Sequence, residues 1–351
     1  MRAMTPSSFA SPVADLWRRT DRVLLAIAAI LFVLVLLDPR QAQESLLFLG
    51  RALGAIAPIL ALSVALAAGI KAAGAEMLVS RAFAARQGRA ILVAAIAGAL
   101  SPLCSCGVVP LIAGLLAAGV PLAPVMAFWL ASPVMDPVMF VLTSGAIGVE
   151  FAIAKTAAAI FMGVAGGWIT RALTRSALLE QPLRATDAEL DTRRLARLDA
   201  MRAAPVQWRF WTEADRAQVF LLSATRNAWT LGRWLALAFV LESLMLAWLP
   251  AEAVARTLGD SGGMAIPLAV LLGIPAYLNG LAAIPLVGGL IGMGMNPAVG
   301  LAFMVAGGVT SIPAAMAVWA LVRPRVFVLY VGLALLLALA SAWLYAAWLA
   351  V

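Results

Sequence analysis

Long apolar runs, separated by shorter segments rich in arginine, follow one another along the chain. Residues 90–149 contain a single charged side chain, Asp136, and residues 261–322 contain none. Further apolar runs cover approximately residues 23–37, 52–70, 150–171, 217–249 and 326–351. Several of these runs reach or exceed the roughly 20 residues that a helix needs to cross a bilayer. The pattern predicts an all-α polytopic membrane protein with about 7–10 membrane segments.

Composition and charge narrow the picture further. Hydrophobic residues make up 64% of the chain and charged residues 12%, which excludes an ordinary soluble domain. The formal net charge of +8 comes mostly from arginines beside the apolar runs. Because arginine-rich flanks are typical of cytoplasmic loops, we expect no nucleic-acid partner. The same rule predicts a cytoplasmic N-terminus and cytoplasmic segments at 73–89 and 171–216, and we expect 23–37 to stay as a first membrane helix.

Two halves of the chain resemble each other at one constant offset. The segment Pro110–Gly119 matches Pro285–Gly294, and Ala127-Phe128 matches Ala302-Phe303, each 175 residues apart. We interpret this as a duplicated unit; the alternative is that helices rich in glycine, alanine and leucine always look alike. The predicted organisation is a cytoplasmic N-terminus with a first membrane helix (1–42), a first permease repeat (43–172), a charged cytoplasmic linker (173–216) and a second permease repeat (217–351).

The arginine-rich segments also constrain the topology. Between the cytoplasmic segments 73–89 and 171–216 the chain must cross the membrane an even number of times, yet three apolar pieces lie there. We therefore expect one piece to be re-entrant, and choose 121–147, which is broken at Ser132-Pro133 and at Asp136-Pro137. Each copy then crosses three times, so the second copy is inverted relative to the first. This predicts two inverted structural repeats with broken or re-entrant helices that meet near the midplane.

Both cysteines of the chain lie in one short motif, Cys104-Ser105-Cys106-Gly107, within an uncharged run. Thiolates bind soft metalloids well, and two thiols two residues apart in unwound backbone can converge on one atom. Glycine permits unusual backbone geometry beside them. The motif therefore predicts a substrate site, with Cys104 and Cys106 as soft-metalloid ligands. The alternative is that each cysteine is simply a small buried hydrophobe.

Polar residues at the other interruptions complete the candidate substrate site. An ionisable residue at membrane depth is functional by default, so Asp136 is expected to carry a coupling proton or to balance a cation. Its alternatives are pairing with Lys155 or a position facing the mouth. We expect Asn279 to face the site, with an interhelical hydrogen bond as the equal alternative. The predicted binding residues are Cys104, Ser105, Cys106, Gly107, Ser132, Asp136, Asn279, Thr310 and Ser311.

The run Pro102–Pro110, followed by Gly119-Val-Pro121 and Ala127–Pro133, resembles the predicted permease family of ArsP-type organoarsenical exporters and YraQ-like proteins. The resemblance covers nearly all of the chain after residue 40. It implies a permease of the bacterial inner membrane with Cys104 and Cys106 as its thiol site. The chain departs from the family at Asn279, where many YraQ-like members have cysteine, and at Asp136, where asparagine is typical.

These observations together predict a permease rather than an enzyme. It would move a small thiophilic or sulfur-containing solute, such as a trivalent organoarsenical or a low-molecular-weight thiol, outward and driven by an ion gradient. No phosphate-binding Gly-Lys-Ser/Thr loop is present in the sequence, and we expect no cofactor. The expected partners are the solute and the lipid bilayer, and a homodimer stays open. The alternative from another class is a membrane thiol oxidoreductase that passes redox equivalents through Cys104 and Cys106.

Overall fold

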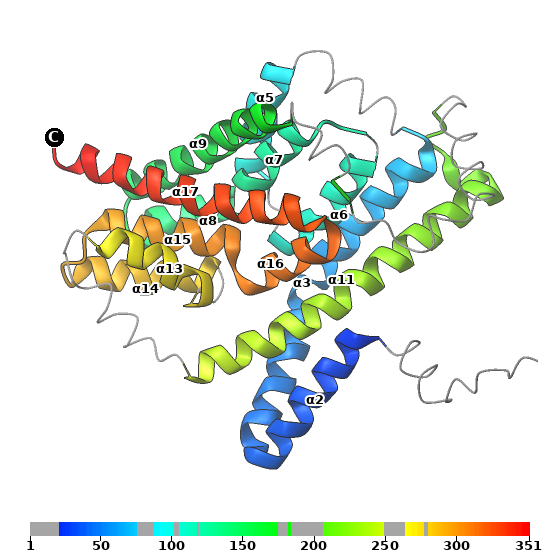
Figure 1. Cartoon of the computed structure of the whole chain (residues 1–351), viewed down its shortest axis with the longest axis horizontal. Coiled ribbons are helices and arrows are strands. Elements are labelled where there is room, and N and C mark those ends of the chain that lie inside the picture. Colours follow the sequence, from blue (N-terminus) through cyan, green and yellow to red (C-terminus); the bar gives the residue numbers. More distant parts are fainter. Residues whose placement is uncertain are drawn as a thin grey trace, which may run out of the picture.

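The computed structural model describes residues 21–75, 87–101, 105–117, 119–174, 182–183, 206–248, 264–276 and 280–351. These residues are almost entirely helical (Figure 1). The helices are α2 (Arg22–Leu37), α3 (Pro39–Ala73), α5 (Gln87–Ala99), α6 (Ser105–Ala117), α7 (Leu122–Ala131), α8 (Pro137–Ala146), α9 (Val149–Leu173), η3 (Phe210–Thr212), α11 (Ala214–Trp248), α13 (Ala265–Ala276), α14 (Gly280–Gly292), α15 (Pro297–Thr310), α16 (Ile312–Leu321) and α17 (Pro324–Leu349). The predicted all-α fold is confirmed.

Three helices begin at an acidic or amide residue followed by proline. Asp38, Asp136 and Asn296 are the N-caps of α3, α8 and α15, and each accepts a backbone hydrogen bond with its side-chain oxygen. The bond from the Met139 N–H to Asp136 Oδ1 measures 2.7 Å. Proline suits the first helical position because its missing N–H would have no intrahelical partner there. Local sequence therefore fixes where these helices start.

Several of the helices are apolar and long enough to cross a membrane. In the described part of the chain these are α9, α17 and the pair α15–α16, which together span Pro297–Leu321. Helix α3 is a fourth candidate, bent by 46° next to Pro58, where proline removes a helical hydrogen bond. Seven shorter apolar helices have 10–17 residues. A helix of about 10 residues is roughly 15 Å long, half the hydrocarbon core, so these pieces suit broken spans. The chain is a multi-pass membrane protein.

The helices of the two halves start in the same register. Helices α3, α6, α7, α8 and α9 begin at residues 39, 105, 122, 137 and 149, and α11, α14, α15, α16 and α17 begin 175 residues later. The offset seen in the sequence is therefore also the offset between helix boundaries. The break predicted between Ser132 and Pro137 is present, because α7 ends at Ala131 and α8 starts at Pro137.

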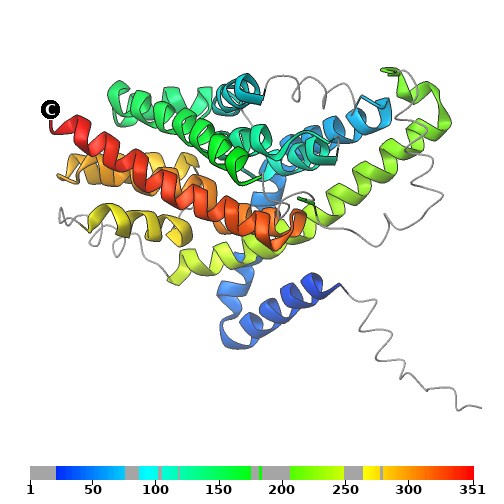
Figure 2. The same cartoon turned by 45° about the horizontal axis from the view of Figure 1, so that its top comes forward.

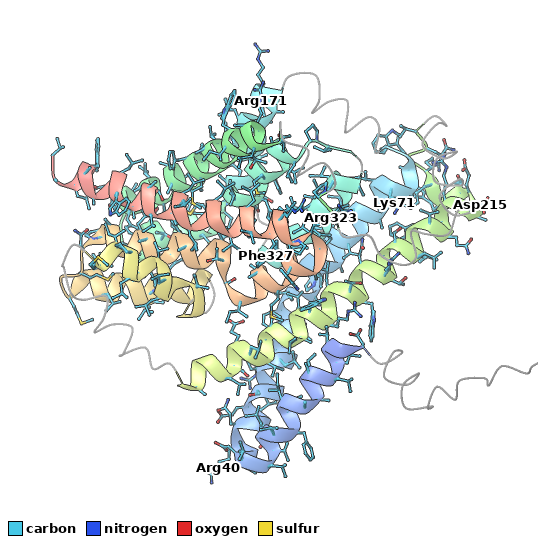
Figure 3. The ribbon with its side chains drawn as sticks, in the orientation of Figure 1. Arg40, Lys71, Arg171, Asp215, Arg323 and Phe327 are labelled. Atoms are coloured by element: carbon cyan, nitrogen blue, oxygen red, sulfur yellow. The ribbon has the colours of Figure 1, made fainter. Side chains whose placement is uncertain are left out.

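Two pairs of corresponding helices, α3 with α11 and α9 with α17, pack side by side and run in opposite directions. Near one end of the α3–α11 pair, the Ser243 hydroxyl donates to Ser45 Oγ at 2.8 Å, and near the other Arg216 Nη1 donates to the Ala72 carbonyl at 3.1 Å. Figure 3 shows Lys71 and Asp215 together at this second end, far from Arg40. Helices α9 and α17 are also antiparallel: Phe151, at the start of α9, packs against Tyr345, near the end of α17, and Gly166, later in α9, faces Leu337, earlier in α17. Their orientation in the membrane stays a prediction.

Helices α2 and the first part of α3 extend away from the remaining bundle (Figures 1 and 2). The bundle itself is built around α7 and α15, whose side chains are nearly all buried. Two short segments of the arginine-rich linker dock on it. The Gln207 N–H donates to the Ala73 carbonyl, and the Arg323 N–H donates to the Pro182 carbonyl, each at 3.0 Å. The first of these contacts joins two segments that are predicted to share the cytoplasmic side, 73–89 and 171–216.

Candidate functional site

The cysteine motif lies at the start of α6. Cys104 is outside the described residues, whereas Ser105, Cys106 and Gly107 form the first turn of the helix. Asn279 is also outside the described residues, and it directly precedes α14, the helix that corresponds to α6. The first N–H groups of a helix have no intrahelical acceptor and are open to a ligand. Each copy thus starts a short helix at the position where the sequence predicts a binding residue.

The first break lies between α7 and α8. Ser132 is buried and caps the end of α7, its N–H donating to the Phe128 carbonyl at 3.0 Å. Pro133 follows, and it cannot donate the next helical hydrogen bond, to the Trp129 carbonyl. The chain leaves the helix there and re-enters it at Asp136, which is partly exposed and caps α8. One carboxylate oxygen of Asp136 therefore stabilises the start of α8, where the break ends.

The second break lies between α15 and α16. It is shorter than the first, because only Ser311 separates the two helices. Thr310 is buried, with its hydroxyl donating to the Ala306 carbonyl at 2.7 Å, and Ser311 is the buried N-cap of α16. Pro313 has no N–H, so the Val309 carbonyl lacks its helical partner four residues ahead. The Tyr330 hydroxyl takes that place and donates to the Val309 carbonyl at 2.8 Å. A side chain of α17 thus closes the second break, in the sense that it supplies the hydrogen bond that Pro313 cannot donate.

One aromatic pair joins the two breaks. The rings of Trp129, on α7, and Tyr330, on α17, lie with centroids 4.8 Å apart, and both side chains are 1% exposed. Trp129 is three residues before Ser132, and the partner of Tyr330 immediately precedes Thr310. The structure therefore brings the predicted residues Ser132, Thr310 and Ser311 to one buried region.

Sequence reasoning missed both aromatic residues of this pair. A signal for Tyr330 was present, because it is one of three tyrosines in the chain and lies inside an apolar run, where a buried hydroxyl needs a partner. Nothing in the local sequence named the Val309 carbonyl as that partner.

Replacing Tyr330 by phenylalanine should destabilise the protein by about 1–3 kcal/mol, the cost of leaving a buried carbonyl without a hydrogen bond. The change keeps the ring against Trp129 and removes only the hydroxyl. Melting of the purified protein in detergent measures the effect. Tyr345→Phe is the matched control, because the Tyr345 hydroxyl makes no hydrogen bond to a described residue and its ring stays against Phe151. Equal melting temperatures for the two variants would contradict this role of Tyr330.

Helices α6 and α14, which begin at or directly after predicted site residues, each contact a helix of the other half. Helix α6 packs against α16, whose N-cap is Ser311, and α14 packs against α8, whose N-cap is Asp136. Helix α6, with Cys106, therefore contacts the helix that follows the second break. Helix α14, directly after Asn279, contacts the helix that follows the first break.

The alternative of a pair between Asp136 and Lys155 is not realised as a hydrogen bond. Lys155 Nζ makes no hydrogen bond to any described residue. Within the part of the chain that the structure describes, no cluster of three or more histidine, cysteine or acidic side chains is arranged to hold a metal ion.

Comparison with known proteins places this architecture in a family. The UPF0718 protein YcgR of Bacillus subtilis (strain 168) is 34% identical over 91 residues, which is 26% of this chain and 31% of that relative. The match thus spans about a third of that relative's length. No solved structure matches. The family model ArsP_1, described as a predicted permease, matches residues 41–347, and the chain therefore belongs to this predicted permease family.

Proposed function

We propose that this permease moves a small thiophilic or sulfur-containing solute through a site formed by Cys104–Gly107 on α6 and by the residues of the two breaks. A trivalent organoarsenical and a low-molecular-weight thiol are the solute types that fit. A two-thiol site suits them because thiolates prefer soft atoms. The proposed site residues are Cys104, Ser105, Cys106, Gly107, Ser132, Asp136, Asn279, Thr310 and Ser311.

One observation carries the proposal. Helix α6, which contains Cys106, packs against the helix after the second break, and α14, which follows Asn279, packs against the helix after the first break. This pairing of α6 with α16, and of α14 with α8, is reciprocal. Corresponding helices α3 and α11 also run antiparallel. Reciprocal contacts and opposite directions are what inverted repeats produce, and transporters with inverted repeats bind solutes where their broken helices meet. We therefore propose inverted repeats over 43–172 and 217–351, joined by the linker 173–216.

The remaining features of the proposal follow from charge. Arginine-rich segments favour an inner-membrane protein with a cytoplasmic N-terminus. Asp136 is the proposed coupling group, because it is an ionisable side chain at a break in an otherwise uncharged run. With no ATP-binding loop in the sequence, an ion gradient would drive export. The proposed site lies within one chain, so a homodimer is not required.

Flux measurements in proteoliposomes test the proposal. Methylarsenite uptake into the vesicles should stop when N-ethylmaleimide alkylates the protein, because Cys104 and Cys106 are the only cysteines. The cysteine-free variant should show only the residual flux of the alkylated protein, and the reagent should not lower that flux further. Undiminished flux of methylarsenite and of a thiol solute after complete alkylation would reject the site. Redox cycling of the cysteine pair without solute flux would instead identify a thiol oxidoreductase.

A further inference from the structure

Lys155 is a charged side chain in the interior of the bundle. It lies on α9, a helix long and apolar enough to cross a membrane, and its exposed fraction is 0%. Its Nζ has no hydrogen-bond partner among the described residues. The chain contains only one other lysine, Lys71, which lies in the last turn of α3. An ammonium that is both buried and without a direct partner is costly, and such groups in membrane helices usually serve the transport path.

The position of Lys155 corresponds to that of Tyr330. The two residues are 175 apart and lie in the second turn of the corresponding helices α9 and α17. Tyr330 uses its hydroxyl to close the second break at Val309. Lys155 makes no such hydrogen bond, although α9 packs against α8, the helix that begins at the first break. The two copies therefore differ: the hydroxyl of Tyr330 has an acceptor at the second break, whereas the ammonium of Lys155 has no acceptor among the described residues.

Neighbouring groups leave these donors open. Asp136 Oδ1 accepts from the Met139 N–H at 2.7 Å, so this oxygen is committed to the cap of α8. Helix α8 packs against α9 and contributes Thr143, which is 0% exposed and whose hydroxyl also lacks a partner among the described residues. A lysine ammonium has three donors and no acceptor. An anionic group supplies the acceptors that these donors need.

We propose that Lys155 binds a negatively charged group, such as a carboxylate, on the transported solute at the first break, with the Thr143 hydroxyl as a second donor. The inference rests on the proposed function and adds that, among its thiophilic solutes, the protein prefers those that carry a negative charge. Asp136 competes with that group for the ammonium. Removing the Asp136 charge should therefore strengthen anion binding, whereas removing the Lys155 charge should weaken it.

Isothermal titration calorimetry of the purified protein with three probes tests this assignment. The probes are 2-mercaptoacetate, its uncharged methyl ester, and acetate, at a pH where the carboxylates are ionised. Wild-type protein should bind 2-mercaptoacetate at least about tenfold more tightly than the ester, the usual contribution of a charge-assisted hydrogen bond. Lys155→Met should abolish this preference and leave the affinity for the ester unchanged. Asp136→Asn, which keeps a capping oxygen, should increase the preference.

Two controls keep the result interpretable. Lys71→Met deletes the chain's other lysine charge, and Tyr330→Phe alters the corresponding position of the second copy; neither should change the preference for the acid. Equal binding of acid and ester by wild-type protein, or a preference that survives in a folded Lys155→Met variant, would overturn the proposal. Acetate separates it from the cysteine site: binding of acetate that depends on Lys155 but not on Cys104 and Cys106 supports the anion site even if the thiol mechanism fails.

Discussion

Proteoliposomes that contain the Cys104→Ser/Cys106→Ser variant should lose methylarsenite flux by a factor on the order of 100 or more. The hydroxyl of serine is similar in size to a thiol but is a hard ligand, and it binds arsenic(III) poorly. A factor of 100 in affinity corresponds to about 2.7 kcal/mol. Flux of radioactive methylarsenite into vesicles of matched protein content measures the effect.

The single variants test whether the two thiols act together. If both sulfurs bind one arsenic atom, Cys104→Ser and Cys106→Ser should each cause most of the loss seen in the double variant, so that the effects are far from additive. A melting temperature within a few degrees of wild type establishes that each variant is folded. Wild-type flux in a folded double variant would remove the thiol site from the mechanism while leaving the family assignment untouched.

Leucine at Gly98 or Gly273 should prevent stable folding of the bundle, the largest structural effect we expect. A Cβ atom added at Gly98 would lie 2.7 Å from the Phe128 carbonyl oxygen, and one added at Gly273 would lie 2.7 Å from the Phe303 carbonyl oxygen. Both contacts are with backbone, which cannot rotate away, and the two glycines and the two phenylalanines are each 175 residues apart. Small residues permit such close approach of membrane helices.

Even alanine at these positions should cost about 1–3 kcal/mol, although alanine is the better helix former. Folded yield after detergent extraction and melting temperature measure the effect. Gly145→Leu and Gly289→Leu are the matched controls, because an added Cβ at either helical glycine meets no atom within 4 Å. Stable, monodisperse Gly98→Leu and Gly273→Leu proteins would contradict the close packing of α5 on α7 and of α13 on α15.

Much of the architecture could be predicted from local sequence because its causes are local. Prolines and their capping partners set the ends of helices, so the break between Ser132 and Pro137 was predicted where it occurs. The offset of 175 was readable from Pro110 and Pro285, which lie inside the corresponding helices α6 and α14. The prediction of a multi-pass helical membrane protein required only the length of the apolar runs and the near absence of charge within them.

The roles of Tyr330, Trp129 and Lys155 could not be predicted in the same way. Tyr330 is 21 residues from the carbonyl that it satisfies, and Trp129 and Tyr330 come from different halves of the chain. From the sequence, Lys155 was considered only as an alternative partner of Asp136, whereas the structure leaves its ammonium buried without a hydrogen bond to a described residue. Which face of α9 points inward depends on α7, α8 and α17 together, and no local pattern encodes that choice.

The sequence by itself determined a helical membrane protein, the register of its two related halves and the places where helices stop, because hydropathy and proline act within a few residues. Only the tertiary structure decided that α3 and α11 pack antiparallel and that α6 and α14 each contact the helix after the other copy's break. It also decided that Tyr330 closes one break, whereas the buried ammonium of Lys155 has no hydrogen bond to a described residue. These features arise from contacts between residues far apart in the chain, where packing and hydrogen bonding select one arrangement from many that the same apolar helices would allow.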